Sequence, residues 1–213
     1  MIGVLNYGGG NLGSVENALK RLGAPFCYVD EASDIDACLS SSSSPSPSSK
    51  KFEKIIMPGD GHFGTTMASL NKTHLSQAIK KWINADKPFL GICIGLQVLF
   101  ESSEEAPGVC GLGIIEGTVK RFPGRKVPQI GWNQTLANPS PKKKLFDGTP
   151  ENSFFYYIHS YYAAAKNNDD VCGTAEYYLK YCAAVERGNL AAVQFHPEKS
   201  GTEGIALLER WVN

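Results

Sequence analysis

A cysteine between two glycines is the first feature of this sequence that could do chemistry. Cys93 lies in PFLGICIGLQVLF (88–100), with Gly91 and Gly95 two residues to either side. The pattern G-x-C-x-G has the form of a nucleophile elbow, a sharp strand-to-helix turn that exposes its central side chain above a sheet. A thiol at a helix N-terminus is favoured as the thiolate, and the backbone amide of Ile94 is placed to hold an oxyanion. On this pentapeptide alone, a buried structural cysteine in a tight turn remains the alternative.

A histidine and a glutamate in AVQFHPEKSG (192–201) supply the groups that such a thiol needs. His196 and Glu198 are two residues apart, so in an extended segment their side chains point to the same side, and Pro197 stiffens the link. Glu198 can then hold the imidazole while His196 acts on Cys93, first as general base and then as acid. The other histidines have no carboxylate at comparable spacing and are predicted to be non-catalytic: His62, His74 and His159.

The periodicity of apolar residues predicts the elements that position these groups. A strand at 2–7, a helix at 11–23 and a strand at 25–30 form a β-α-β opening, which indicates parallel strands. We also expect strands at 54–59 and 88–92, a helix at 74–85, and another helix directly after Cys93. Strand-like segments follow at 113–122, 153–163, 173–179 and 182–195, and a helix closes the chain at 204–213. The pattern predicts an α/β fold: an open, mostly parallel sheet with helices on both faces and added antiparallel strands.

Composition narrows the possible functions. The 213 residues suit a single domain, 1–213, and the 21 basic residues balance the 21 acidic ones, so nucleic acid and membrane surfaces are not predicted partners. The N-terminus has no signal-peptide character and no apolar run has transmembrane length, which indicates a cytoplasmic protein. Six cysteines without a CxxC pair predict reduced thiols and no metal site. The five outside the elbow are predicted to be packing residues: Cys27, Cys38, Cys110, Cys172 and Cys182. The serine-rich segment 40–51 is predicted to be a mobile surface insert, and 139–144 a solvated turn.

A glycine loop supports a competing interpretation. Gly8-x-Gly10-x-x-Gly13 follows a strand and opens a helix, and Asp30 ends the next strand. This is the form of a dinucleotide-binding fingerprint with its ribose carboxylate. The alternative is a glycine-rich turn that lets the backbone pass closely over the sheet. A dinucleotide-binding module therefore remains an alternative function.

The combined motifs resemble a known family. GICIGLQ with QFHPEKSG is similar to the triad-type, or class I, glutamine amidotransferases. NYGGGNLGSVENAL, MPGDG, VPQIGWN and YYIHSY further resemble the glutaminase part of imidazole glycerol phosphate synthases, and the likeness runs from residue 2 to about 212. The resemblance implies a flavodoxin-like fold and hydrolysis of L-glutamine to glutamate and ammonia, without a cofactor. It also implies a (β/α)8-barrel cyclase of histidine biosynthesis, as a subunit or a fused domain, that receives the ammonia. A free-standing γ-glutamyl thiol hydrolase is a further alternative.

The same resemblance assigns roles to individual residues. It implies a catalytic triad of Cys93, His196 and Glu198, and an oxyanion hole formed by Gly59 and Ile94. Positions matching those that hold glutamine are Gln97, Glu105, Ser160 and Tyr161. Positions in segments that face the cyclase are Asn11, Trp132 and Lys199. One departure is Asp60, which stands where the family usually has an apolar residue. A carboxylate beside the oxyanion strand should oppose negative charge there, unless it points to solvent or pairs with a cation.

Overall fold

Parallel strands form the centre of the molecule. The computed structural model describes residues 1–40, 50–138 and 143–213. Within it, strands β2, β1, β3, β4 and β13 run parallel and lie side by side in that order. This is the strand order of flavodoxin-like folds, whose sites lie at the carboxyl ends of the strands. The bounds are β1 (Ile2–Leu5), β2 (Phe26–Val29), β3 (Lys54–Met57), β4 (Phe89–Ile92) and β13 (Leu190–Val193).

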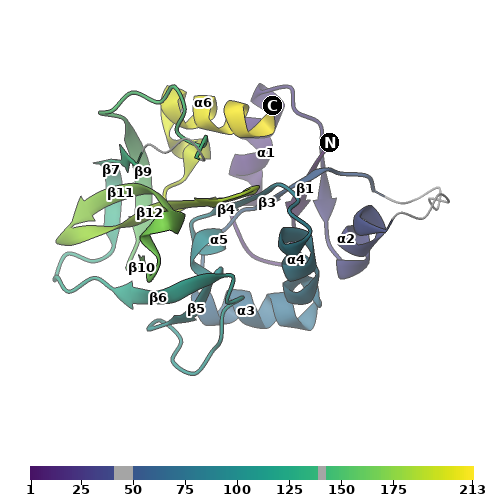
Figure 1. Cartoon of the computed structure of the whole chain (residues 1–213), viewed down its shortest axis with the longest axis horizontal. Helices are drawn as coiled ribbons and strands as arrows, with labels where there is room; N and C mark the ends of the chain where they lie inside the picture. Colours follow the sequence, from purple (N-terminus) through teal and green to yellow (C-terminus); the bar gives the residue numbers. More distant parts are fainter. Residues whose placement is uncertain (41–49, 139–142) are drawn as a thin grey trace.

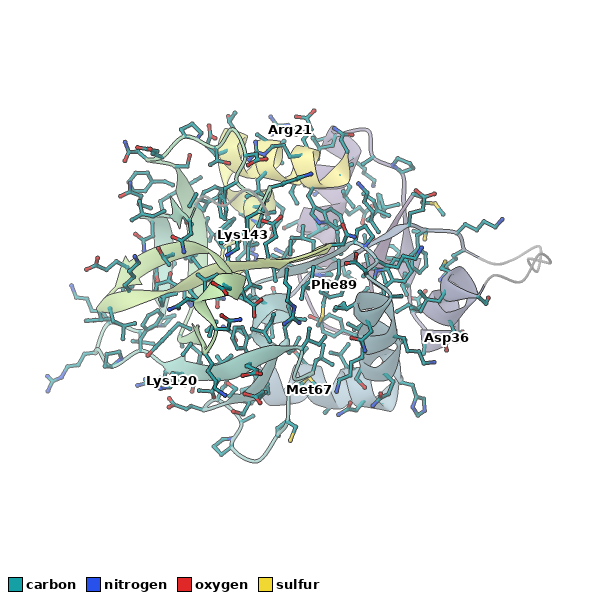
Figure 2. The ribbon with its side chains drawn as sticks, in the orientation of Figure 1. Arg21, Asp36, Met67, Phe89, Lys120 and Lys143 are labelled. Carbon is teal, nitrogen blue, oxygen red and sulfur yellow. The ribbon has the colours of Figure 1, made fainter. Side chains whose placement is uncertain are left out.

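Helices cover both faces of this sheet, as Figure 1 shows. Because successive strand residues point to opposite faces, Ile55 packs with the core around α2, α3 and α4, whereas Ile56 packs with the core around α1 and α6. Figure 2 shows Phe89 and Met67 on the side of α3 and α4, where both are buried. The helices are α1 (Leu12–Arg21), α2 (Ala32–Leu39), α3 (Phe63–Lys72), α4 (Leu75–Asn84), α5 (Ile94–Gln97) and α6 (Gly201–Val212).

Further strands extend the sheet beyond β13. Strands β12, β10 and β6 continue it in antiparallel pairings, β5 joins β6 in parallel, and β8 and β11 attach through β12. A separate antiparallel pair is formed by β7 and β9. The bounds are β5 (Phe100–Ser103), β6 (Ile115–Arg121), β7 (Gln129–Gln134), β8 (Leu136–Ala137), β9 (Phe154–His159), β10 (Tyr161–Ala165), β11 (Val171–Tyr177) and β12 (Leu179–Arg187), with short 3₁₀ turns η1 (Asn168–Asp170) and η2 (Pro197–Lys199).

The predicted fold class is confirmed, and several details differ, among them strands β5, β7 and β8, which were not predicted. The strand predicted at 153–163 breaks at Ser160, so that β9 and β10 belong to different sheets. The helix predicted after Cys93 is a single turn, because the carbonyls of residues 98–100 accept hydrogen bonds from the backbone N–H groups of residues 112–115, which draw the chain into β5. Helices α2 and α3 were not predicted.

The two low-complexity segments are only partly described. The predictions for 40–51 and 139–144 fall mainly on residues 41–49 and 139–142, which lie outside the described residues. At the end of the first segment, Lys50 forms ion pairs with Asp30 at 2.9 Å and Asp34 at 3.1 Å. Among the helices that the structure describes, none has both the length and the apolar character needed to cross a bilayer.

Candidate active site

The turn at Cys93 explains why glycine flanks the thiol. Cys93 follows β4 directly and has φ of +54° and ψ of −105°, a conformation that is strained for any residue with a side chain. A Cβ on Gly91 would lie 2.5 Å from the Gly95 carbonyl oxygen, and a Cβ on Gly95 would lie 2.5 Å from the Met57 carbonyl oxygen. Only glycine therefore allows the backbones to approach closely enough to form this turn.

His196 and Glu198 are held together at the end of β13. The His196 Nδ1 lies 2.8 Å from Glu198 Oε1, and each side chain is only 1% exposed. The prediction of an extended segment was wrong in part. His196 is extended, but Pro197–Lys199 form a 3₁₀ turn. The pair still forms, since the turn keeps Glu198 beside the ring. The backbone N–H of His196 also donates to the Tyr156 carbonyl at 2.9 Å, which fixes the turn against β9.

The electrostatics of His196 favour the protonated ring. Burial alone lowers the pKa of His196, but its interactions with Cys93 and then with Glu198 outweigh burial and raise this pKa to about 10. Nε2 is buried and has no hydrogen-bond partner in the part of the chain that the structure describes. Cys93 thus acts on the imidazole without a formed hydrogen bond, and catalytic contacts of this kind commonly tighten when substrate binds.

A pocket opens beside Cys93 with a volume of about 290 Å³. This is near the lower end of the range for small-molecule sites and suits a ligand of amino-acid size. Glu105 is anchored there by the backbone N–H of Phe63, which donates to Oε2 at 2.7 Å. The pocket brings together six of the predicted residues: Cys93, Ile94, Gln97, Glu105, Ser160 and Tyr161.

The predicted oxyanion residues are adjacent. Gly59 lies against Ile94 so closely that a Cβ on the glycine would stand 1.9 Å from Ile94 Cγ2. Next to them, the hydroxyl of Tyr7 donates to the Pro58 carbonyl at 2.9 Å. Asp60 also lines the pocket but is exposed, and no ion pair among the described residues includes it. Its carboxylate therefore has water to screen it.

The three residues predicted to face a partner gather around η2. Trp132 is 57% exposed on β7, and a Cβ on Gly201 would lie 3.6 Å from its ring. Lys199 is part of η2 and is partly exposed, while Asn11 caps α1, which contacts η2. The exposed face of β7 and β9 extends this region with more large apolar side chains: Ile130, Phe154 and Ile158.

The glycine loop is used within the fold. A Cβ on Gly10, which has φ of +92°, would lie 3.1 Å from the Tyr7 hydroxyl and 3.2 Å from the Pro58 carbonyl oxygen. Asp30, the carboxylate expected to bind a ribose, instead pairs with Lys50 and accepts a hydrogen bond from Asn6 at 2.9 Å. These contacts favour the turn over the dinucleotide interpretation.

Sequence reasoning missed several residues at the site. His159 lines the pocket, and burial lowers its pKa to about 4, so the ring is neutral. Tyr7 and Gln194 are also buried there, and a polar residue inside the apolar run LAAVQF was the available signal for Gln194. Among the other cysteines, Cys110 is exposed, so predicting it as a packing residue was wrong.

Comparison with known proteins identifies the family. The model of the class I glutamine amidotransferases matches residues 4–212. The chain therefore belongs to the class I glutamine amidotransferase family. Solved structures support the same fold: a glutamine amidotransferase and PurLQS from Thermotoga maritima each superpose with a TM-score of 0.71 at 19% identity, covering 99% of this chain and 96% of theirs.

Curated relatives narrow the comparison further. The imidazole glycerol phosphate synthase subunit HisH of Moorella thermoacetica is 43% identical over 211 residues, which are 99% of this chain and 93% of that protein. The protein of the same name from Dehalococcoides mccartyi is 41% identical over 212 residues, covering 99% and 96%. The chloroplastic imidazole glycerol phosphate synthase hisHF of Arabidopsis thaliana is 39% identical over 218 residues, which cover this whole chain but 34% of that longer protein.

Proposed function

We propose that this chain is the glutaminase of an imidazole glycerol phosphate synthase and hydrolyses L-glutamine to supply ammonia for histidine biosynthesis. The relatives at about 40% identity over the full chain support the pathway. The observation that carries the chemistry is the buried His196–Glu198 pair beside the strained Cys93. The family match over 4–212 supports treating residues 1–213 as one catalytic domain.

Each residue of the triad has a defined task in this proposal. The Cys93 sulfur attacks the γ-amide carbon of glutamine, and the carbonyl oxygen takes the negative charge. The backbone amides of Ile94 and Gly59, the latter in the loop after β3, hold that oxyanion. The close approach of these two residues and the position of Ile94 in the first turn of α5 support this role. His196, already protonated, gives its proton to the leaving nitrogen, and ammonia departs from a γ-glutamyl thioester. Water then attacks the thioester, His196 accepts its proton, and glutamate leaves. Glu198 stabilises the imidazolium throughout.

The pocket walls supply substrate recognition. Glu105 presents a carboxylate that can accept hydrogen bonds from the α-ammonium of glutamine. Gln97, Ser160 and Tyr161 add amide, hydroxyl and backbone groups around the chain of the amino acid. We assign no metal or cofactor to this reaction, because thiol, imidazole and carboxylate suffice for amide hydrolysis.

The partner is a cyclase of the (β/α)8-barrel class. This partner binds at the apolar face of β7 and β9. Its side chains Ile130, Trp132 and Phe154 are each at least half exposed and lie close to the catalytic edge. Contiguous exposed apolar side chains of this kind are typical of interaction sites. Lys199, which directly follows Glu198, can transmit docking to the triad. A reducing compartment such as the cytoplasm fits six free cysteines, one of which is the catalytic thiol.

The test is glutamate release by the chain with and without the cyclase and its ribonucleotide ligand. We expect weak release alone, strong release in the complex, and none from Cys93→Ala. Synthesis by the complex from added ammonia should survive the mutation, since that step belongs to the cyclase. Strong activity of the isolated chain on γ-glutamyl peptides would instead favour the free-standing hydrolase, and glutamate release by Cys93→Ala would end the triad proposal.

A further inference from the structure

Gln194 is a fully buried polar side chain next to the nucleophile. It follows β13 and is 0% exposed, within an otherwise apolar run. β13 and β4 pair in parallel with Val193 beside Ile92, so the next residues on each strand, Gln194 and Cys93, lie side by side at the catalytic edge. The backbone N–H of Gln194 donates to the Ala183 carbonyl at 2.8 Å, which leaves its side chain as the part available for the site.

A chain of amide hydrogen bonds fixes which end of Gln194 meets the sulfur. The Tyr161 carbonyl can only accept, so Gln97 must turn its Nε2 toward it, at 3.0 Å. The same Nε2 donates to Gln194 Oε1 at 3.0 Å. With its oxygen engaged there, Gln194 presents Nε2 to Cys93 Sγ at 3.6 Å, a normal distance for a donor to sulfur. The opposite orientation of the Gln194 amide would place its NH2 group against the NH2 group of Gln97, two donors with no acceptor between them, so the network selects a donor for Cys93.

The same series of hydrogen bonds connects the Cys93 sulfur to Tyr161 and His159, which line the substrate pocket. The Tyr161 carbonyl that orients Gln97 lies 2.7 Å from His159 Nδ1, and His159 is the neutral ring that lines the pocket. Because neutral imidazole has one N–H, a proton on Nδ1 satisfies this carbonyl and completes the network. A displacement of Tyr161 or His159 would therefore change the position of the Gln194 amide that donates to Cys93.

We propose that Gln194 is a positioning residue that stabilises the Cys93 thiolate through its amide N–H and couples it to the substrate wall through Gln97. The kinetic part of this inference rests on the proposed glutaminase function. A hydrogen bond to an ionised acceptor is about twice as strong as one between neutral groups, so this donor favours the thiolate over the thiol. The strained turn sets where the sulfur stands, and Gln194 supplies a hydrogen-bond donor to it.

Other titratable groups lie around the same sulfur and must stay constant in a test. His196 with Glu198 comes from the turn after β13, and Tyr7 comes from the loop after β1. Three further titratable groups line the pocket from other elements: Asp60, Glu105 and His159. None of them is altered by Gln194→Met, which adds no ionisable group, so a change in the pH profile of that variant reports the loss of the amide.

The test measures alkylation of Cys93 as a function of pH. Gln194→Met keeps the length of the side chain without the donor, and Gln194→Glu keeps its shape and, when ionised, has acceptors only. Iodoacetamide is the probe, and mass spectrometry of the peptide that holds Cys93 reads the rate. The exposed Cys110 in the same sample is the internal reference. Gln77→Met on the exposed face of α4 is the matched control.

We expect the midpoint of the Cys93 profile to move upward by about one pH unit in Gln194→Met, with alkylation about tenfold slower at pH values below the wild-type midpoint. The shift should be larger in Gln194→Glu, while the Cys110 profile and the Gln77→Met control match the wild type. Folded variants with the wild-type Cys93 profile would overturn the inference. The assay needs no glutamine turnover, so a wild-type chain that alkylates normally but releases no glutamate refutes the proposed function and leaves the Gln194 inference standing.

Discussion

Replacing Glu198 with glutamine removes the charge beside His196 while keeping the shape of the side chain. Glu198 and His196 meet at 2.8 Å with both side chains 1% exposed, so solvent does not screen the pair. Removing one partner of such a buried pair costs about 3–5 kcal/mol, because the other charge is left uncompensated. Glutamine can still accept one hydrogen bond through its oxygen, so we take the lower end of the range.

About 3 kcal/mol converts to roughly a hundredfold lower kcat for glutamine hydrolysis, since each 1.36 kcal/mol is a factor of ten. The pKa of His196 should also fall from about 10, because burial, which lowers it, is then opposed by Cys93 alone. The ring loses its proton at lower pH, and the alkaline limb of the pH–rate profile moves to lower pH with it.

The assay is glutamate release by the complex with its cyclase across pH 6 to 10, with Glu209→Gln on the exposed side of α6 as the control. His196→Ala should be slower than Glu198→Gln, since it removes the group that moves the proton. A Glu198→Gln enzyme within twofold of the wild type, or one slower than His196→Ala, would refute the assigned roles.

Three further outcomes are expected. Gly95→Ala should lower the free energy of unfolding by about 1–3 kcal/mol in urea titrations, because the added Cβ meets the Met57 carbonyl oxygen. Gly13→Ala is the control: its Cβ would have nothing within 4 Å, so this variant should be neutral or stabilised by about 0.5 kcal/mol. Equal losses of stability in the two variants would contradict the close approach at Gly95. His159→Gln should flatten the pH dependence of the unfolding free energy between pH 6.5 and 4. In the wild type the buried ring has its pKa lowered to about 4, so over this range the unfolded state takes up a proton that the folded state does not, and stability falls by about 3 kcal/mol as the pH drops. An unchanged slope in the variant would show that another group titrates there. Trp132→Ala should weaken cyclase binding by about 2 kcal/mol in calorimetry, without lowering the melting temperature of the isolated chain. Leu136, which is 47% exposed on β8, provides the control, and Leu136→Ala should bind the cyclase normally. Identical affinities for the two variants would place the docking surface elsewhere.

Local chemistry made the fold class and the main site residues predictable. The elbow at Cys93 needs small neighbours within two residues, and the His196–Glu198 contact spans two residues, so both leave a signature in the sequence. That contact survived although the segment is a 3₁₀ turn rather than extended, because in either geometry the two side chains are near each other in the chain.

Features that depend on strand order had no such signature. Gln194 meets Cys93 only because β13 pairs with β4, although the residues are far apart in sequence. Tyr7 reaches the Pro58 carbonyl only because β1 lies next to β3. The apolar run after Cys93 fits a buried helix or a strand equally well, and the hydrogen bonds from residues 112–115 decide between them. Tertiary pairing, not local pattern, determined each of these outcomes.

Side chains alternate along β9, so that one side of the strand packs in the core and the other side is available to a binding partner. Phe154, Tyr156 and Ile158 face outward, whereas Phe155 and Tyr157 are fully buried in the core. Outward positions can change as the surface of a binding partner changes, and the buried positions need not follow. We therefore expect that, across species, the outer residues of β9 vary together with the partner while the inner residues vary with the rest of the core, so that specificity for a partner evolves without repacking the fold.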